Sequence, residues 1–131
     1  TGSVWLATPE AETSEAFRAK MIAARSRDTV RSRSRTGKPA RQLKTAWHDA
    51  WDGADGPGTL PMPLMGMISE PSFARVEQAV LGGNAAARDL VSYFVGQGVG
   101  LIDSERSSRQ VVQDFREDFA AAVDRLTATL V

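Results

Sequence analysis

The chain has 131 residues, of which 42% are hydrophobic and 24% charged, and its sixteen basic residues balance its sixteen acidic ones. This composition is ordinary for a soluble globular domain with a modest core. The chain has no cysteine and one histidine, which excludes disulfides and thiolate chemistry and makes an intrinsic zinc site improbable. No signal peptide is visible, and no stretch approaches the roughly 18 apolar residues that span a membrane, so we expect a cytoplasmic protein with no membrane partner.

The first residues, TGSVWL, join a small polar triplet to an apolar run from Val4 to Leu6. We expect this run to be a β-strand, followed by a helix over roughly 9–25 with Thr8 as its N-cap and Pro9 in its first turn. No neighbouring strand is evident for it in this sequence. Because an unpaired strand edge must be satisfied by something, we expect its partner strands to lie in preceding sequence.

A basic segment follows, with ten basic residues and one acidic residue, Asp28, between Arg18 and Lys44. Alternating Arg and Ser after Thr29 predict a short exposed strand or extended arm, ending at a turn near Gly37, and a helix follows near 39–51. The arm has three interpretations: a solvated face, a surface that pairs with acidic groups, or a site for a phosphorylated substrate. The candidates for the third are Arg31, Arg33, Arg35, Lys38 and Arg41. A nucleic-acid partner is not expected, because stacking aromatics are missing from the arm.

The second half of the chain predicts mainly helices. A Gly/Pro-rich loop over 52–66 precedes a helix that starts at Ser69 and Pro71, runs to about Leu81 and is closed by two glycines. A shorter helix is expected around 84–92. The last segment, 107–129, carries apolar residues at every third or fourth position and predicts one long amphipathic helix.

Two glycine-containing turns could carry binding chemistry. Gly2-Ser3 lies beside the expected strand and helix start, where backbone N–H groups can meet an anion. Gly96-Gln97-Gly98 forms a second turn, and the Gln97 amide either points into a ligand pocket or fixes a neighbouring backbone.

The segments TGSVWLATPEAETSEAFRAKMIAA and DTVRSRSRTGKPARQLKTAW, with the later PMPLMG and VGQGVGLI, resemble the C-terminal third of the nitronate monooxygenase (2-nitropropane dioxygenase-like) flavoproteins. The match covers most of the chain, and the order of the motifs is more specific than any one of them. Lys38 and Ser3 depart from the family's usual Arg and Thr.

The resemblance implies an α/β protein in which this chain is the C-terminal part of an FMN-binding (β/α)8 TIM barrel with a mostly helical cap. Residues 1–28 would be the last strand-helix unit, 29–105 the cap, and 106–131 a C-terminal helix. Thr1, Gly2 and Ser3 would bind the FMN phosphate. Gln97 would face the substrate pocket, and Arg35, Lys38 and Arg41 would contact the phosphates of a CoA substrate.

The activity implied is oxidation of a carbon acid through flavin and oxygen, with the catalytic base upstream of this chain. His48 lies where the family has no catalytic histidine, so we expect it to be structural. A flavin-dependent reductase or dehydrogenase of an acyl-CoA or enoyl thioester, such as relatives linked to steroid-ring degradation, stays an alternative, with oxygen or a nicotinamide as redox partner. A non-enzymatic helical binding module is a second alternative. The expected partners are the rest of the barrel and a small-molecule substrate, and a homo-oligomer stays open.

Overall fold

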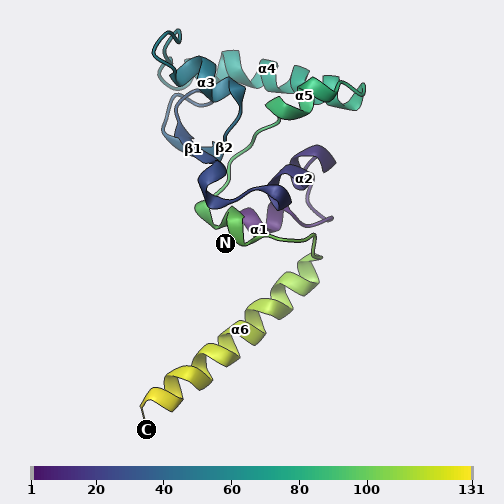
Figure 1. The fold of residues 1–131 in the computed structure, drawn as a ribbon, viewed down its shortest axis with the longest axis vertical. Coiled ribbons are helices and arrows are strands. Elements are labelled where there is room, and N and C mark those ends of the chain that lie inside the picture. Colours follow the sequence, from purple (N-terminus) through teal and green to yellow (C-terminus); the bar gives the residue numbers. More distant parts are fainter. Residues whose placement is uncertain (1, 131) are drawn as a thin grey trace.

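The computed structural model describes residues 2–130, and Figure 1 shows them as a mostly helical body from which one long helix projects. The helices are α1 (Gly2–Leu6), α2 (Glu15–Ala23), α3 (Ala46–Asp52), α4 (Leu64–Leu81), α5 (Ala85–Leu90) and α6 (Ser108–Thr129). Two strands, β1 (Thr29–Ser32) and β2 (Ala40–Leu43), and two 3-10 turns, η1 (Ser26–Asp28) and η2 (Gln97–Leu101), complete the set. The expectation of a largely helical segment is confirmed.

The strand expected over Val4–Leu6 is wrong, because these residues belong to helix α1. No strand lies beside them among residues 2–130, where the only sheet pairs β1 with β2. A helix satisfies its backbone within its own segment, whereas a lone strand leaves its N–H and C=O groups unpaired. The Thr8 hydroxyl donates to the carbonyl of Trp5 at 2.8 Å and so closes the end of α1.

The helix expected over 9–25 is shorter and starts later, at Glu15. Its N-cap is Ser14 rather than Thr8, since the Ser14 hydroxyl accepts the backbone N–H of Phe17 at 3.3 Å. Both Ser14 and Thr8 suit the N-cap position. The helix starts after Ser14 because the residues that follow it, Phe17 and Met21, form the apolar face that is buried in the core.

The basic segment forms an antiparallel hairpin in which Arg31 is the direct partner of Arg41. The strand expected after Thr29 is therefore confirmed. The helix expected over 39–51 is wrong in its first part, where β2 pairs with β1, and correct from Ala46 to Asp52. An isolated antiparallel bridge pairs Gln42 of β2 with Phe94, so the chain near residue 94 lies beside the hairpin at β2.

The core lies between α2, β2 and the segment from Val91 to Ile102. Its buried members are Ala7, Phe17, Met21, Leu43, Val91, Val95, Val99 and Ile102. This packing holds the Gly96–Gly98 turn close to the start of the chain.

Helix α4 begins at Leu64, five residues before the expected start at Ser69, and it contains Pro71. Proline is usually found in the first turn of a helix because it lacks an N–H. Here Met65, Ser69 and Phe73 are all buried on one side of α4. Burial of this face extends the helix through the loop-like sequence in front of Pro71.

Helix α6 starts where the sequence predicts. The Ser107 hydroxyl accepts the N–H of Gln110 at 3.3 Å, and the Gln110 side chain accepts the N–H of Ser107 at 2.9 Å. This reciprocal pair is a capping box. Only Val111 of α6 is buried, and Figure 1 shows the helix leading away from the body. No helix of the described residues is both long enough and apolar enough to cross a membrane.

Candidate functional site

A cavity of about 560 Å³ lies where α1, the glycine turn before η2 and the first turns of α6 meet. Its floor includes Gly2, Ser3, Gly96 and Gly98. The Ser3 hydroxyl accepts the backbone N–H of Gly96 at 2.7 Å. Gly2-Ser3, expected to be a turn, forms the first residues of α1. Two glycine-containing segments, each singled out from the sequence and 93 residues apart, therefore share one cavity. Thr1, the third residue expected at the phosphate, lies outside the described residues.

The glycines leave open space on this floor. A Cβ added at Gly2 or at Gly98 would meet nothing within 4 Å, and one at Gly96 would lie 3.5 Å from the Ser3 hydroxyl. Absence of a side chain lets a ligand approach the backbone closely. The floor can therefore offer N–H groups and one hydroxyl to an anionic or polar ligand.

The charges around the cavity are mainly negative. Asp103, Asp114 and Asp118 line it together with one cation, Arg106. The Arg106 guanidinium donates to Asp114 at 2.9 Å and to Asp103 at 3.0 Å. The hydrogen bond from the Ser104 hydroxyl and the charge of Arg106 lower the pKa of Asp103, so this carboxylate is ionised at neutral pH.

An FMN phosphate therefore fits the cavity in one respect and not in another. Gly2, Ser3 and the Gly96 turn provide the kind of donors that hold a phosphate. The three aspartates exceed the single arginine in charge, and a phosphate dianion would be repelled by them. Within this chain the donor chemistry fits, and the balancing cation is missing.

Gln97 does not line the cavity, although its neighbours Gly96 and Gly98 do. Its backbone carbonyl accepts the Ser26 hydroxyl at 2.6 Å, which ties η2 to η1. This contact uses the main chain of Gln97 and not its side-chain amide. A contact between the Gln97 amide and a substrate stays a prediction.

Arg35 lies in the interior, which the sequence interpretation missed. It is 5% exposed, and its guanidinium pairs with both carboxylate oxygens of Glu70, at 2.9 and 3.1 Å. It also donates to the carbonyl of Ser92 at 2.9 Å. The guanidinium stands 4.3 Å from the centre of the Phe73 ring. We therefore assign Arg35 a structural role and correct its expected contact with CoA phosphates.

Lys38 and Arg41 remain nearer the surface, Lys38 exposed and Arg41 partly so. Arg41 donates to the Thr29 hydroxyl at 2.9 Å, a contact within the hairpin. Neither Lys38 nor Arg41 lines the cavity at Gly2 and Ser3. Their expected contact with a phosphate stays a prediction.

His48 is buried and packs at the start of α3. Its Nδ1 accepts the backbone N–H of Thr45 at 3.0 Å, so the imidazole caps the helix. Burial lowers the pKa of His48, which keeps the ring neutral. The geometry agrees with the structural role expected from the sequence. Among residues 2–130 no group of three or more His, Asp or Glu side chains is arranged to hold a metal ion.

The chain is similar in sequence to one curated protein and in fold to solved structures. It is 53% identical over 126 residues to "Putative monooxygenase Rv1533" of Mycobacterium tuberculosis, an alignment that covers 95% of this chain and 33% of that protein. No family model matches.

Two solved structures of FabK from Thermotoga maritima are similar in fold to this chain. A point mutant of FabK gives a TM-score of 0.57 at 28% identity and is matched over 94% of this chain and 33% of its own. FabK itself gives a TM-score of 0.61 at 23% identity, with 94% and 37% covered. The chain thus spans about a third of the length of the relatives it matches.

Sequence reasoning missed the residues that line the far wall of the cavity. Asp103, Arg106 and Asp114 come from the link before α6 and from its second turn. They lie within the stretches DSER (103–106) and QDF (113–115), which are typical of a polar surface. The charged residues grouped around the α6 capping box were the only available signal.

Proposed function

We propose that this chain is part of a flavin-dependent oxidoreductase of the nitronate monooxygenase-like kind, with FMN as its cofactor. The observation that carries the proposal is the 53% identity, over nearly the whole chain, to a protein named as a monooxygenase. The likeness of fold to FabK supports the same class. The proposal no longer uses a strand at Val4–Leu6, since that segment is helical.

The contribution of this chain to cofactor binding is one wall of the phosphate site. Gly2 and Ser3 would offer backbone N–H groups, with the Ser3 hydroxyl fixed by the Gly96 N–H. The cation that offsets Asp103 and Asp114 would come from the part of the protein outside this chain. Bound flavin supplies the electron-accepting ring that oxidises a carbon acid, and the base that removes the substrate proton also lies outside this chain.

The visible spectrum of the full-length protein tests the cofactor. We expect absorption bands near roughly 375 and 450 nm and release of FMN on denaturation, because flavins carry this chromophore wherever they bind. A folded, colourless protein that does not take up added FMN would contradict the proposal.

Replacing Gly2 with Leu tests the placement of the phosphate. The new side chain has open space in this chain, so the fold should survive while the approach of a phosphate is blocked. We expect FMN affinity to fall at least about tenfold, a loss of roughly 1.4 kcal/mol. Gly66→Leu is the matched control, because Gly66 is also a helical glycine with open space but does not line the cavity. Equal FMN affinity in both variants would move the phosphate elsewhere.

A second candidate is a flavin-dependent reductase or dehydrogenase that acts on a thioester of a phosphate-bearing carrier. The observation that favours it is a pair of arginines in the β1–β2 hairpin, Arg31 exposed and Arg41 partly exposed, with no carboxylate within ion-pair distance among the described residues. Turnover of a small nitronate with oxygen, compared with turnover of CoA thioesters, separates the two candidates.

A further inference from the structure

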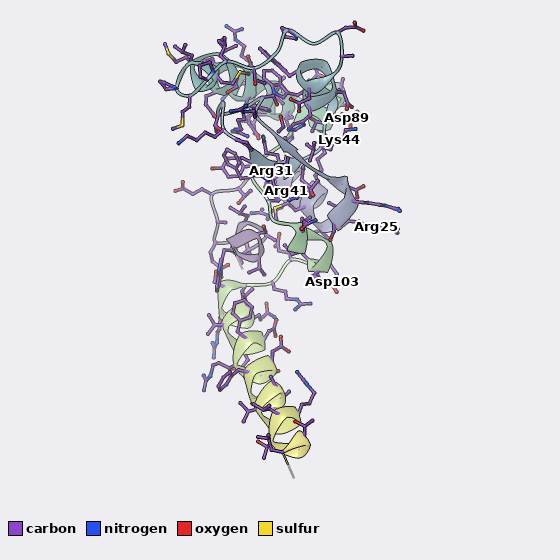
Figure 2. The ribbon with its side chains drawn as sticks, turned by 90° about the vertical axis from the view of Figure 1, so that its left-hand side faces the viewer. Arg25, Arg31, Arg41, Lys44, Asp89 and Asp103 are labelled. Atoms are coloured by element: carbon purple, nitrogen blue, oxygen red, sulfur yellow. The ribbon has the colours of Figure 1, made fainter. Side chains whose placement is uncertain are left out.

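The β1–β2 hairpin places two like charges directly opposite each other. Arg31 and Arg41 are register partners in an antiparallel pair, so their side chains leave the same face of the hairpin. Directly opposite residues have Cβ atoms about 4.5–5.5 Å apart, and like charges at this distance oppose folding. Figure 2 labels the two arginines next to each other, with Lys44 and Asp89 above them and Arg25 below and to their right.

Three cations of the basic segment have acidic partners, whereas Arg31 and Arg41, like Arg33 and Lys38, have none among residues 2–130. Arg35 binds Glu70, and Lys44 lies 2.9 Å from a carboxylate oxygen of Asp49. Among residues 2–130 no carboxylate lies within ion-pair distance of Arg31 or Arg41. The Arg41 guanidinium is held by the neutral Thr29 hydroxyl at 2.9 Å, which orients it without neutralising it.

The pair adjoins the segment that forms the candidate site. The backbone N–H of Val95 donates to the carbonyl of Arg41 at 3.1 Å, and the next residue is Gly96. Ser26, one residue after Arg25, donates to the carbonyl of Gln97. A ligand held at the pair would therefore lie beside the backbone that continues into the glycine turn.

We propose that Arg31 and Arg41 form a binding site for the diphosphate or phosphate group of a ligand. Guanidinium groups offer planar forks of N–H donors that match phosphate oxygens. Two guanidinium groups side by side match a ligand with two adjacent phosphoryl groups better than they match a ligand with a single carboxylate. A bound dianion would remove the repulsion between the two register partners. The site does not depend on flavin chemistry.

Binding to the full-length protein tests the site by calorimetry at low salt, with pyrophosphate, inorganic phosphate and ADP as probes. We expect pyrophosphate and ADP to bind more tightly than inorganic phosphate, because they span both guanidinium groups. Arg31→Gln and Arg41→Gln should each weaken pyrophosphate about tenfold, the loss expected for charge-assisted hydrogen bonds. If ADP exceeds pyrophosphate, the ligand is a nucleotide-like carrier; if the two are equal, the diphosphate alone is recognised.

Arg75→Gln is the control. Arg75 is exposed on α4, so this substitution removes the same charge away from the hairpin. The site is overturned if Arg75→Gln weakens pyrophosphate as much as Arg41→Gln, or if the wild-type protein binds none of the probes.

Thermal unfolding without ligand gives a second, independent readout. Since Arg31 and Arg41 repel each other, each Gln variant should unfold at the same or a higher temperature than wild type, and pyrophosphate should stabilise wild type most. Destabilisation of both variants without ligand would show that the arginines pair with a carboxylate outside this chain, and it would overturn the proposal. The flavin spectrum of these variants should match wild type, which separates failure of this site from failure of the proposed activity.

Discussion

The two longest helices, α4 and α6, place similar residues in opposite surroundings. Phe73 of α4 is 6% exposed and packs against Trp47 and the Arg35 guanidinium. Phe119 of α6 is 71% exposed, and Leu126 and Leu130 on the same helix are also exposed. Helix α4 is thus fixed along its length by tertiary contacts within this chain, whereas α6 contacts the body through its first turns and leaves its apolar residues from Phe119 onward exposed.

The largest contrast is expected from one substitution on each helix. Phe73→Ala should lower the free energy of unfolding by about 3–5 kcal/mol, since it leaves a cavity beside Trp47. Phe119→Ala in this 131-residue chain should change it by less than about 0.5 kcal/mol, as for other exposed sites. Chemical denaturation of both variants measures the difference.

The same pair of variants in the full-length protein sharpens the comparison. We propose that the apolar stripe of α6 packs on the part of the protein outside this chain. A cost for Phe119→Ala in the full-length protein near that for Phe73→Ala would support this packing. An unchanged, small cost would show that the stripe stays in solvent.

How well the sequence predicted each helix follows from what stabilises it. The start of α6 depends on Ser107 and Gln110, which are three residues apart, and the local pattern was sufficient. The start of α4 depends on burial of Met65 and Ser69, and the Ser69 hydroxyl donates to the carbonyl of Arg35, 34 residues away. The Pro71 signal was local and was overridden by this long-range contact.

The candidate site shows the same division. Gly2-Ser3 and Gly96-Gly98 were found because glycine beside a small or polar residue is a local signature, although Gly2-Ser3 starts helix α1 and is not a turn. Their meeting in one cavity depends on a hydrogen bond across 93 residues, which no local pattern contains. Arg35 was misassigned for a related reason: its partners Glu70 and Ser92 are distant in sequence, and arginine in a basic run suggests surface.

The second prediction concerns the anchor of α4. Arg35→Ala should lower the free energy of unfolding by about 2 kcal/mol, because the buried carbonyl of Ser92 loses its donor. Arg33→Ala is the matched control two residues away, since Arg33 is exposed and its one side-chain hydrogen bond is to Gly37. Equal effects in urea unfolding would contradict the structural role of Arg35.

The third prediction is a pH dependence that involves the body and not α6. Burial lowers the pKa of His48 below its ordinary value of about 6.5. As pH falls below about 6.5, the unfolded chain takes up a proton before the folded one does, so stability is full above this pH and falls below it. Unfolding measured from pH 7.5 to 5 should show this loss.

His48→Asn is the control for the pH dependence, because the Asn oxygen can accept the Thr45 N–H without titrating. The variant should lose less stability between pH 7.5 and 5 than wild type. Parallel curves for the two proteins would assign the pH dependence to another group.

The smallest expected effect lies at the junction between the body and α6. Both Glu10 carboxylate oxygens accept the Ser108 N–H, at 3.2 and 3.1 Å, and this hydrogen bond lowers the pKa of Glu10. The negative charge also suits the N-terminus of a long helix.

Glu10→Gln should therefore speed amide exchange in the first turn of α6 at neutral pH and leave α4 unchanged. Lowering the pH of wild type through the depressed pKa of Glu10 should reduce the protection factors of the same amides, measured relative to the slower intrinsic exchange at low pH, because protonation removes the charge. Glu12→Gln provides the comparison, since Glu12 is exposed and has no hydrogen bond to α6 among the described residues. Equal exchange in the two variants would mean that the capping box alone holds the start of α6, and that the orientation of α6 does not depend on the body.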